Sequence, residues 1–403
     1  MGSSNEDGAG KAGQGVKAPS GENGVAARRL AIEAIERIEK DGAYANLLLP
    51  TLLAESNLDE RDRGFVTELV YGSTRMKRSL DYLVDRFIDR DDVDSRVRAA
   101  LRIGAYQIAF LRVPAHAAVD ATVAATPKRG RGFVNAVLRK VSAAEQKAET
   151  QWPTKGIELS YPDWIVKRLD EDLGERAEPV LRAMNTAATV HVRDDQYRQD
   201  LSSQQVSELI TDDGLILDLC AAPGGKATYV ATTRGSTSGA QRTVIGSDLH
   251  EHRVGLIRAA ADDTDTDVLA IVADATNPPY RAGSADAVLI DAPCSGLGSL
   301  RRRADARWRI TQANVDDLAG LQFDLVKAAA DLVKPGGQVV FSVCTLTEAE
   351  SIEVDDRIAR ELPQLAPQLL GEPWEPWGRG GRLLPDEFAG DGMAAFSYRV
   401  RAL

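Results

Sequence analysis

The spacing of apolar residues changes at Leu215, and this change constrains the fold more than any other feature of the sequence. Before Leu215, apolar residues recur at helical intervals. After it, short apolar runs such as "LILDLC", "TVIGSD", "VLAIVAD", "AVLIDA" and "GQVVFSVC" alternate with helical segments. Alternating strands and helices indicate a parallel sheet covered by helices. We therefore expect an all-α bundle followed by an α/β domain with a mainly parallel sheet.

The helical part is expected over residues 25–143. In "VAARRLAIEAIERIEK", apolar side chains including Leu30, Ile35 and Ile38 share one helical face. Asp59 is a plausible N-cap for a second helix, and Pro114 would stop a later one. Residues 1–24 are rich in Gly, Ser and charged side chains, so we interpret them as a disordered tail. Residues 144–204 are assigned to a linking segment, and residues 205–403 to the α/β domain.

Composition excludes several classes of protein. No apolar run reaches the roughly 18–20 residues that a membrane helix needs, and the first residues lack the apolar stretch of a signal peptide. Three cysteines are too few and too scattered for a disulfide framework or a zinc site. We expect a cytoplasmic protein with no bound metal and no membrane partner, and take a monomer as the default.

The strand ends carry a pattern typical of nucleoside binding. The first strand runs into "CAAPGGK", where glycines let the backbone approach a ligand. The next strand ends at Asp248, near the roughly 20-residue offset at which a carboxylate takes ribose hydroxyls in dinucleotide folds. The third ends at Asp274, placed to meet an adenine edge. Gly-Gly followed by two carboxylates at successive strand ends favours an adenosine pocket.

Two cysteines end the following strands. Asp291 and Cys294 close the fourth strand, and Cys344 closes the fifth. A lone buried cysteine is usually a small hydrophobic residue, and Cys220 fits that interpretation. Cys294 and Cys344 would instead open onto the edge that carries the adenosine pocket. Two thiols and a carboxylate beside such a pocket suggest a thiolate nucleophile.

Two basic runs are the candidate contacts to nucleic acid. The net charge of −11 argues against nonspecific binding, because phosphate affinity comes from Lys and Arg. However, "PKRGRGFVNAVLRKV" (127–141) contains no acidic residue, and "LRRRADARWR" (300–309) carries five arginines against one aspartate. Each run alone is more often a solvated surface. Beside a nucleotide-like pocket, contact with RNA phosphates becomes the better interpretation of the second run.

The motifs "LDLCAAPGGK", "DAPCSGLGSLRRRADARW" and "LQFDLVKAAADLVKPGGQVVFSVCT" resemble the Nol/Nop/Sun family of RNA cytosine-5 methyltransferases. The helical part, with "GFVNAVLRKV", resembles the NusB-like RNA-binding extension of the RsmB (Sun) subfamily. This resemblance implies a Rossmann-like domain with seven strands and S-adenosylmethionine as cofactor. The implied substrate is a cytosine of small-subunit (16S) ribosomal RNA. The family's small RNA-binding subdomain looks truncated here, within 144–204.

The resemblance also implies residue roles. Cys344 would attack the base, Cys294 would assist product release, and Asp291 would hold the cytosine edge, with Lys226 a further catalytic residue. For the cofactor, Asp248 would take the ribose with Arg253 nearby, and Asp274 would face the adenine. The other implied cofactor contacts are Cys220, Ala221, Ala222, Pro223, Gly224, Gly225, Lys226 and Asp291. The implied RNA contacts are Arg301, Arg302, Arg303, Lys128, Arg129 and Arg131.

Three alternatives remain open from the sequence. The substrate could be a cytosine of tRNA or of DNA, and in a DNA-type mechanism the Pro-Cys thiol, Cys294, would attack. The third alternative is a noncatalytic RNA-binding or assembly factor, although a scaffold has no need of two thiols at one edge. The sequence does not indicate which cytosine is modified, or whether the substrate is naked RNA or a ribosomal particle.

Overall fold

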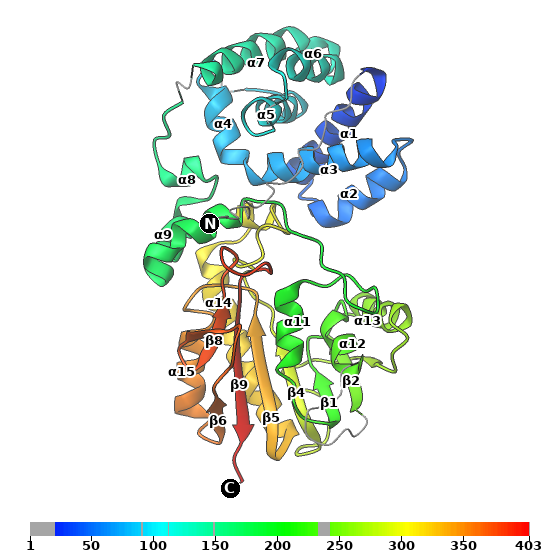
Figure 1. Ribbon diagram of the computed structural model, residues 1–403, viewed down its shortest axis with the longest axis vertical. Coiled ribbons are helices and arrows are strands. Elements are labelled where there is room, and N and C mark those ends of the chain that lie inside the picture. Colours follow the sequence, from blue (N-terminus) through cyan, green and yellow to red (C-terminus); the bar gives the residue numbers. More distant parts are fainter. Residues whose placement is uncertain (1–20, 90–91, 112, 148–149, 233–241, 403) are drawn as a thin grey trace, which may run out of the picture. The chain divides into compact units, whose positions relative to one another are not determined.

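The computed structural model describes residues 21–402 except 90–91, 112, 148–149 and 233–241. The chain divides into two compact units, Met1–Ser160 and Tyr161–Leu403. The first unit is helical, as predicted (Figure 1). Its elements are α1 (Gly21–Lys40), α2 (Ala45–Ala54), α3 (Glu60–Arg75), α4 (Lys77–Asp85), α5 (Ser95–Ala109), α6 (Ala115–Ala125), η1 (Lys128–Gly130), α7 (Arg131–Gln146) and α8 (Lys155–Glu158).

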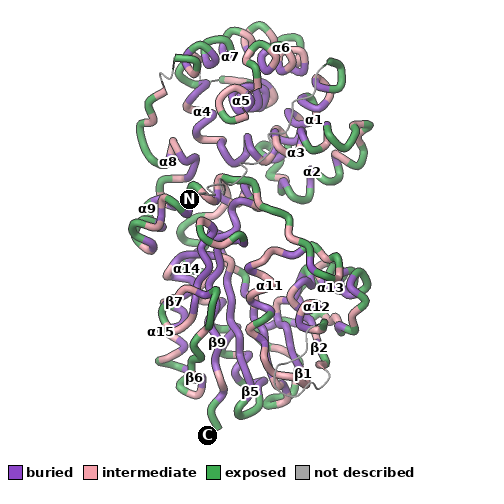
Figure 2. Tube along the Cα trace, in the orientation of Figure 1, coloured by how far each residue is buried: buried purple, intermediate pink, exposed green. Residues whose placement is uncertain are grey.

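The core of the first unit forms where the apolar faces of its helices meet. Helix α1 packs against α3, α5 and α6, and the sides that face inward are buried in Figure 2. The predicted N-cap is confirmed, because Asp59 accepts a hydrogen bond from the backbone N–H of Asp62. A break at Met76 divides the predicted second helix into α3 and α4. Helix α2 contains Pro50 and was not predicted.

The predicted boundaries fall differently on the structure. Of the predicted tail, residues 1–20 lie outside the described residues, and 21–24 begin α1. Residues 144–146 complete α7. From Tyr161 onward, the predicted linking segment belongs to the second compact unit and contains three helices.

The second unit contains the α/β domain. Its helical elements are α9 (Asp163–Leu173), η2 (Gly174–Arg176), α10 (Ala177–Ala183), α11 (Leu201–Glu208), α12 (Gly225–Thr232), α13 (Glu251–Asp263), η3 (Ala306–Trp308), α14 (Gln312–Leu332) and α15 (Ile352–Glu361). Its strands are β1 (Gly214–Asp218), β2 (Arg242–Asp248), β3 (Leu269–Val272), β4 (Ala285–Asp291), β5 (Val333–Val343), β6 (Leu365–Gln368), β7 (Glu375–Trp377), β8 (Gly380–Leu383) and β9 (Met393–Val400).

These strands form one sheet in the order β3-β2-β1-β4-β5-β9-β8-β7, with β6 also paired to β9. The five strands β3, β2, β1, β4 and β5 pair in parallel. The pairings of β9 with β5, β6 and β8 are antiparallel. The prediction of a mainly parallel sheet is confirmed. The described residues form nine strands rather than the predicted seven, and three short strands, β6, β7 and β8, lie on the antiparallel side of the sheet.

Two groups of helices cover the sheet, α11 with α12 and α13, and α14 with α15 (Figure 1). The chain reverses direction across the sheet between β1 and β4, since β2 and β3 lie on one side of β1 and β4 on the other. Ligands of open α/β sheets bind at the carboxyl ends of the strands beside such a reversal. No helix among the described residues is long and apolar enough to span a membrane.

Gly224 fixes the turn between β1 and α12. Its φ is +111°, which L side chains rarely adopt, and a Cβ at this position would lie 2.8 Å from the Ala260 Cβ on α13. The Ile257 Cα lies 3.0 Å from the same point. Glycine is therefore required here by the backbone conformation and by the close approach of α13.

We expect Gly224→Ala to lower the free energy of unfolding by about 2 kcal/mol or more, because it combines overpacking with a strained backbone. Gly255→Ala is the matched control. Gly255 lies inside α13, and a Cβ added there would meet nothing within 4 Å, so alanine should stabilise by about 0.5–1 kcal/mol. Urea unfolding followed by circular dichroism measures both changes. Equal stability of the two variants would contradict the requirement for glycine at position 224.

Candidate active site

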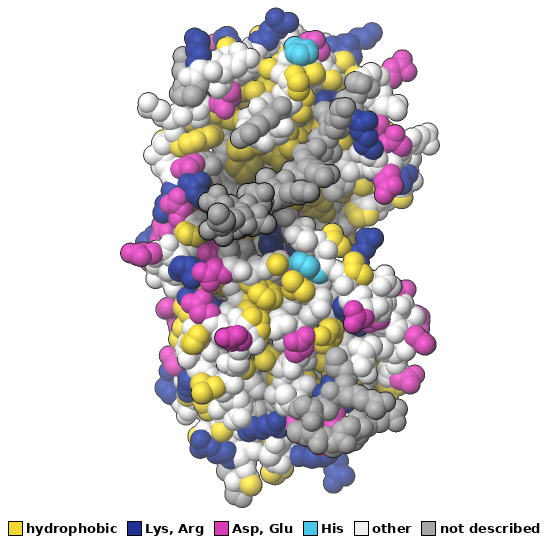
Figure 3. Space-filling model, in the orientation of Figure 1, with side chains coloured by type: hydrophobic (Ala, Val, Ile, Leu, Met, Phe, Trp, Pro, Cys, Tyr) yellow, Lys and Arg dark blue, Asp and Glu magenta, His cyan; other side chains and the backbone are white. Residues whose placement is uncertain are grey.

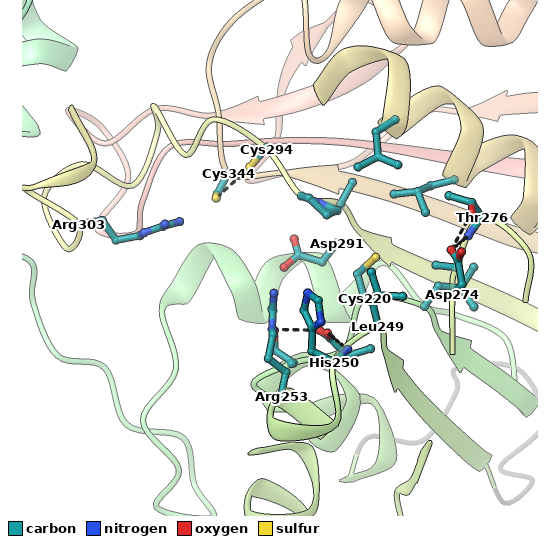
Figure 4. Close-up of a pocket in the computed structure, with 18 residues that line it drawn as sticks. Cys220, Leu249, His250, Arg253, Asp274, Thr276, Asp291, Cys294, Arg303 and Cys344 are labelled. Atoms are coloured by element: carbon teal, nitrogen blue, oxygen red, sulfur yellow. Dashed lines mark hydrogen bonds and ion pairs between the residues drawn. The ribbon is translucent and has the colours of Figure 1, made fainter. Parts of the chain in front are cut away.

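The pairing of β4 with β5 brings the two predicted cysteines together. In this parallel pair Asp291 is in register with Ser342, so the segments after both strands leave the sheet at the same edge. The Ala292 N–H then donates to the Ser342 carbonyl, and the Gly298 N–H to the Cys344 carbonyl. As a result, the sulfur atoms of Cys294 and Cys344 lie 3.2 Å apart (Figure 4).

The two thiols differ electrostatically. The hydrogen bond from the Cys294 thiol lowers the pKa of Cys344; burial and the nearby Asp291 oppose this shift, while Lys226 and the Ser299 hydroxyl favour it. The same hydrogen bond and burial raise the pKa of Cys294 well above its ordinary value. The surroundings thus favour ionisation of Cys344 and disfavour ionisation of Cys294. A thiolate is the nucleophilic form of cysteine.

Asp291 lies beside the thiols in a fixed orientation. One carboxylate oxygen accepts a hydrogen bond of 2.9 Å from the Ser342 hydroxyl. The other forms an ion pair of 2.7 Å with the Lys226 ammonium, which also donates to the Ser203 hydroxyl at 3.2 Å. Burial alone would lower the pKa of Lys226, but the charge of Asp291 outweighs it and the pKa is raised. The lysine is thus held in its protonated form.

A pocket of about 400 Å³ opens beside these residues at the carboxyl edge of the sheet (Figure 4). Asp248 lines it, accepts a hydrogen bond from the His250 N–H and forms an ion pair of 3.2 Å with the guanidinium of Arg253. Asp274 also lines it and accepts from the Thr276 N–H and hydroxyl, which lower the pKa of this aspartate. The other lining residues are Leu219, Cys220, Ala222, Leu249, Ala275, Asp291, Ala292, Pro293, Cys294, Arg303, Leu321, Leu325 and Cys344.

The predicted cofactor residues of the turn 220–226 divide into two groups. Cys220 and Ala222 line the pocket, and burial raises the pKa of the Cys220 thiol, which keeps it protonated. The remaining residues of the turn are not among the lining residues. Gly225 packs closely against Tyr197, since a Cβ added to it would lie 3.1 Å from the Tyr197 ring. Lys226 points to Asp291, with which it forms its ion pair.

The basic run 300–309 does not form the RNA surface predicted from the sequence. Arg301 is 6% exposed and forms an ion pair of 2.8 Å with Asp391, while Arg302 pairs with Asp391 and Asp200. The predicted RNA contact of Arg301 is therefore corrected, because this side chain is buried and its charge is neutralised inside the second unit. The Arg302 side chain is 30% exposed, so its RNA contact stays a prediction. Arg307 is buried over the Tyr161 ring, and Arg309 pairs with Asp305.

Arg303 differs from its neighbours. It is exposed, and its guanidinium extends towards the thiol pair in Figure 4 from the loop that follows Cys294. Of the residues predicted in the first unit, Lys128 and Arg129 are exposed, and Arg129 pairs with Asp94 at 2.8 Å. Arg131 is half-buried and donates to the backbone carbonyls of Ala124 and Thr126, and its RNA contact stays a prediction.

Several residues of the site were missed from the sequence. Ser342 could have been found, because it lies two positions before Cys344 and so faces the same side of a strand. Ser299, whose hydroxyl lies 3.9 Å from the Cys344 sulfur, gives no such signal. Within the described chain, no group of three or more His, Cys, Asp or Glu side chains could hold a metal ion.

A parallel sheet with carboxylates at successive strand ends and a pocket beside them is typical of a Rossmann-like domain that binds a nucleoside. Two family models match the chain. Residues 208–394 match "16S rRNA methyltransferase RsmB/F", and residues 25–143 match the NusB family.

Full-length relatives agree with both matches. A probable ribosomal RNA small subunit methyltransferase B of Bacillus subtilis is 31% identical over 447 aligned residues, covering 93% of this chain and 98% of the relative. A putative methyltransferase of Mycobacterium tuberculosis is 32% identical and covers 81% of this chain and 85% of the relative. The chain belongs to the RsmB/F family of 16S rRNA methyltransferases. It is an rRNA methyltransferase, and its cofactor is S-adenosylmethionine.

Solved structures show the same fold. The crystal structure of PH0851 is 19% identical, with a TM-score of 0.74, covering 95% of this chain and all of the other. A methyltransferase homologue from Pyrococcus horikoshii is also 19% identical, with a TM-score of 0.51, covering 61% of this chain and 97% of the other.

We expect Arg301→Ala to lower the free energy of unfolding by about 3 kcal/mol, because it breaks a buried ion pair. Arg258→Ala is the control. Arg258 pairs with Glu251 at 3.0 Å, but both side chains are more than half exposed, so the change should stay below about 0.5 kcal/mol. Equilibrium urea unfolding compares the two. A negligible cost for Arg301→Ala would return this arginine to the candidate RNA contacts.

Proposed function

We propose that the chain methylates carbon 5 of a cytosine in 16S rRNA through a covalent bond between the base and Cys344. The observation that carries this proposal is the 3.2 Å contact between the two sulfur atoms, a contact that lowers the pKa of Cys344 and raises that of Cys294. Carbon 5 of cytosine is a poor nucleophile. Addition of a thiolate to carbon 6 makes carbon 5 enamine-like, and this chemistry requires one thiolate with a proton acceptor nearby.

The pocket fits the proposed cofactor. Asp248 and Asp274, at successive strand ends, offer carboxylate oxygens that can accept hydrogen bonds from the hydroxyl and amino groups of adenosine. The apolar walls come from Leu249, Leu321 and Leu325. The buried Oδ2 of Asp218 has no hydrogen-bond partner within the described structure, and burial raises the pKa of this carboxyl to about 7. When bound, S-adenosylmethionine supplies an electrophilic methyl group to carbon 5.

Asp291 would hold the edge of the cytosine around N3 and N4. Its carboxylate is fixed by the Ser342 hydroxyl on one side and by the Lys226 ammonium on the other. As the Cys344 thiolate adds to carbon 6, negative charge moves towards N3. A proton can reach N3 through Asp291 from Lys226, which Asp291 keeps protonated. This arrangement gives Lys226 its catalytic role.

Cys294 completes the reaction. The carbon 5 proton must leave before the bond between Cys344 and carbon 6 can break. Once Cys344 is bonded to the base, Cys294 can give its proton to the Asp291–Lys226 pair, which has passed one to N3, and its sulfur then becomes a base. Removal of the carbon 5 proton by the Cys294 sulfur then restores the aromatic ring and releases the Cys344 thiolate.

Recognition of the RNA strand falls on a few exposed cations. On the visible face of the second unit, acidic side chains are interspersed with basic ones, so it presents no broad basic surface (Figure 3). Arg303 is exposed at the mouth of the pocket, where it can bind a phosphate next to the target base. We assign Lys128 and Arg129 of the first unit to further phosphate contacts. A ribosomal substrate and three free cysteines are consistent with a cytoplasmic enzyme.

The first test is covalent trapping. We expect Cys294→Ala incubated with S-adenosylmethionine and unmethylated 16S rRNA to accumulate a protein–RNA band on a denaturing gel, because the adduct forms but does not resolve. Cys344→Ala should form no band and transfer no methyl group. Cys220→Ala is the matched control, because it removes the third thiol, and it should form no more adduct than the wild type.

Each alternative gives a different gel. A band that requires Cys294 and survives Cys344→Ala would reverse the two roles and favour the mechanism in which the Pro-Cys thiol attacks. Absence of both adduct and methyl transfer in the wild type would favour the noncatalytic RNA-binding factor.

A second test concerns Arg303. We expect Arg303→Ala to raise the KM for RNA and to reduce the dependence of log affinity on log salt concentration by about one unit, as loss of one phosphate contact does. Lys334→Ala is the control, because Lys334 pairs with Asp286 at the amino edge of the sheet, away from the pocket. An unchanged salt dependence in Arg303→Ala would remove this arginine from the RNA contacts.

A further inference from the structure

A buried carboxylate lies behind the thiol pair. Glu350 follows Cys344 in the loop after β5, and its side chain is fully buried. Among the described residues, no lysine or arginine lies within ion-pair distance of it. A buried charge without a counter-ion needs several hydrogen bonds to remain ionised. Burial of the Glu350 carboxylate therefore costs free energy, which its hydrogen bonds must offset.

Four donors converge on this carboxylate. One oxygen accepts from the Ser295 N–H at 2.7 Å and from the Gln322 amide at 3.1 Å. The other accepts from the Ser295 hydroxyl at 2.5 Å and from the Thr347 hydroxyl at 3.1 Å. Ser295 comes directly after Cys294, Thr347 belongs to the loop of Cys344, and Gln322 lies on α14. Glu350 thus joins both cysteine loops to one helix.

The network reaches both thiols through the neighbouring residues. The Ser295 and Thr345 hydroxyls, each from the residue after a cysteine, lie 3.0 Å apart. The Gln322 amide also donates to the Pro293 carbonyl at 2.9 Å, on the other side of Cys294. The backbone is therefore fixed on both sides of Cys294 and directly after Cys344. The 3.2 Å separation of the sulfur atoms depends on loops that would otherwise be free to move apart.

We propose that Glu350 is a positioning residue that holds Cys294 against Cys344 and keeps the shared proton on Cys294. It touches neither the pocket nor the reacting sulfur atoms, so it acts through Ser295 and Thr347. This proposal rests on the proposed function of the two cysteines.

The electrostatics of the site agree with this role. The negative charge of Glu350 is one of the groups that raise the pKa of Cys294, after its hydrogen bond to Cys344 and its burial. Asp291 on β4 acts in the same direction on both thiols, and Lys226 on α12 favours the Cys344 thiolate. Glu350 is not among the main causes of the pKa shift of Cys344. The charge of Glu350 therefore contributes to the higher pKa of Cys294, in addition to fixing the positions of the two cysteine loops.

The test measures thiol selectivity in the absence of RNA. The wild type and Glu350→Gln are treated with iodoacetamide at pH 7, and the labelling rates of Cys344 and Cys294 are compared by mass spectrometry. We expect Cys344 to react first in the wild type and the ratio of the two rates to fall about tenfold in Glu350→Gln, as loss of one hydrogen bond to a charged group produces. In methyl transfer to 16S rRNA, kcat should fall by a similar factor with little change in KM.

Two further variants keep the test decisive. Ser295→Ala removes one hydroxyl from the network but retains the charge of Glu350, so it should lower the selectivity less than Glu350→Gln does. It also provides the measurement if Glu350→Gln does not fold. Glu353→Gln, three positions further on and exposed on α15, removes one carboxylate from the same region and should match the wild type.

The outcomes separate the two proposals. Wild-type selectivity in a folded Glu350→Gln protein, or in Ser295→Ala if the first variant does not fold, would overturn the positioning role. A loss of selectivity in Glu350→Gln would uphold the positioning role even if Cys294→Ala formed no RNA adduct and the wild type transferred no methyl group, and those two results would reject the proposed reaction instead.

Discussion

The chemistry of this protein depends on the parallel pairing of β4 with β5. Because Asp291 and Ser342 are in register, the residues that follow the two strands emerge side by side. That single register brings Cys294 and Cys344, which are distant in sequence, to a sulfur–sulfur distance of 3.2 Å. A shift of one residue would turn Cys344 to the other face of the sheet. The interactions of Lys226 and Glu350 refine an arrangement that the strand register makes possible.

Around this pair, the site is built in two layers that act differently. Lys226 and Ser342 fix Asp291 on the side that faces the pocket. Glu350 and Gln322 fix the loops on the side that faces the core. The first layer carries a charge and a counter-charge and can exchange protons with a bound base. The second is sealed from solvent and can only maintain shape and charge.

Much of this arrangement could be predicted from the sequence, because it depends on local patterns. Apolar runs indicated the parallel strands, and the residues at their ends indicated which side chains share an edge. The two cysteines and Asp291 were identified in this way. The prediction that Arg301 contacts RNA was wrong for a physical reason: its partner, Asp391, is far along the chain, and a run of like charges does not indicate where its counter-charge lies. The network of Glu350 was missed for the same reason.

The short strands show the same limit. Strands β6, β7 and β8 contain few residues and little alternation, so their existence depends on pairing with β9 and with one another. Helix α2 contains Pro50, and proline disfavours the interior of a helix. Its buried leucines pack into the core of the first unit and outweigh that preference.

The position of β9 has a consequence for how the protein is made. This strand is the last of the sheet to be synthesised, yet it lies between β5 and β8 and also pairs with β6. The turn before it supplies Asp391, which neutralises Arg301 and Arg302 in the loop after Cys294. Until that turn and β9 have left the ribosome, β5 has an open edge and the arginine loop lacks this counter-charge. The loop that carries Cys294 therefore acquires its full set of contacts only once β9 has been synthesised and inserted into the sheet.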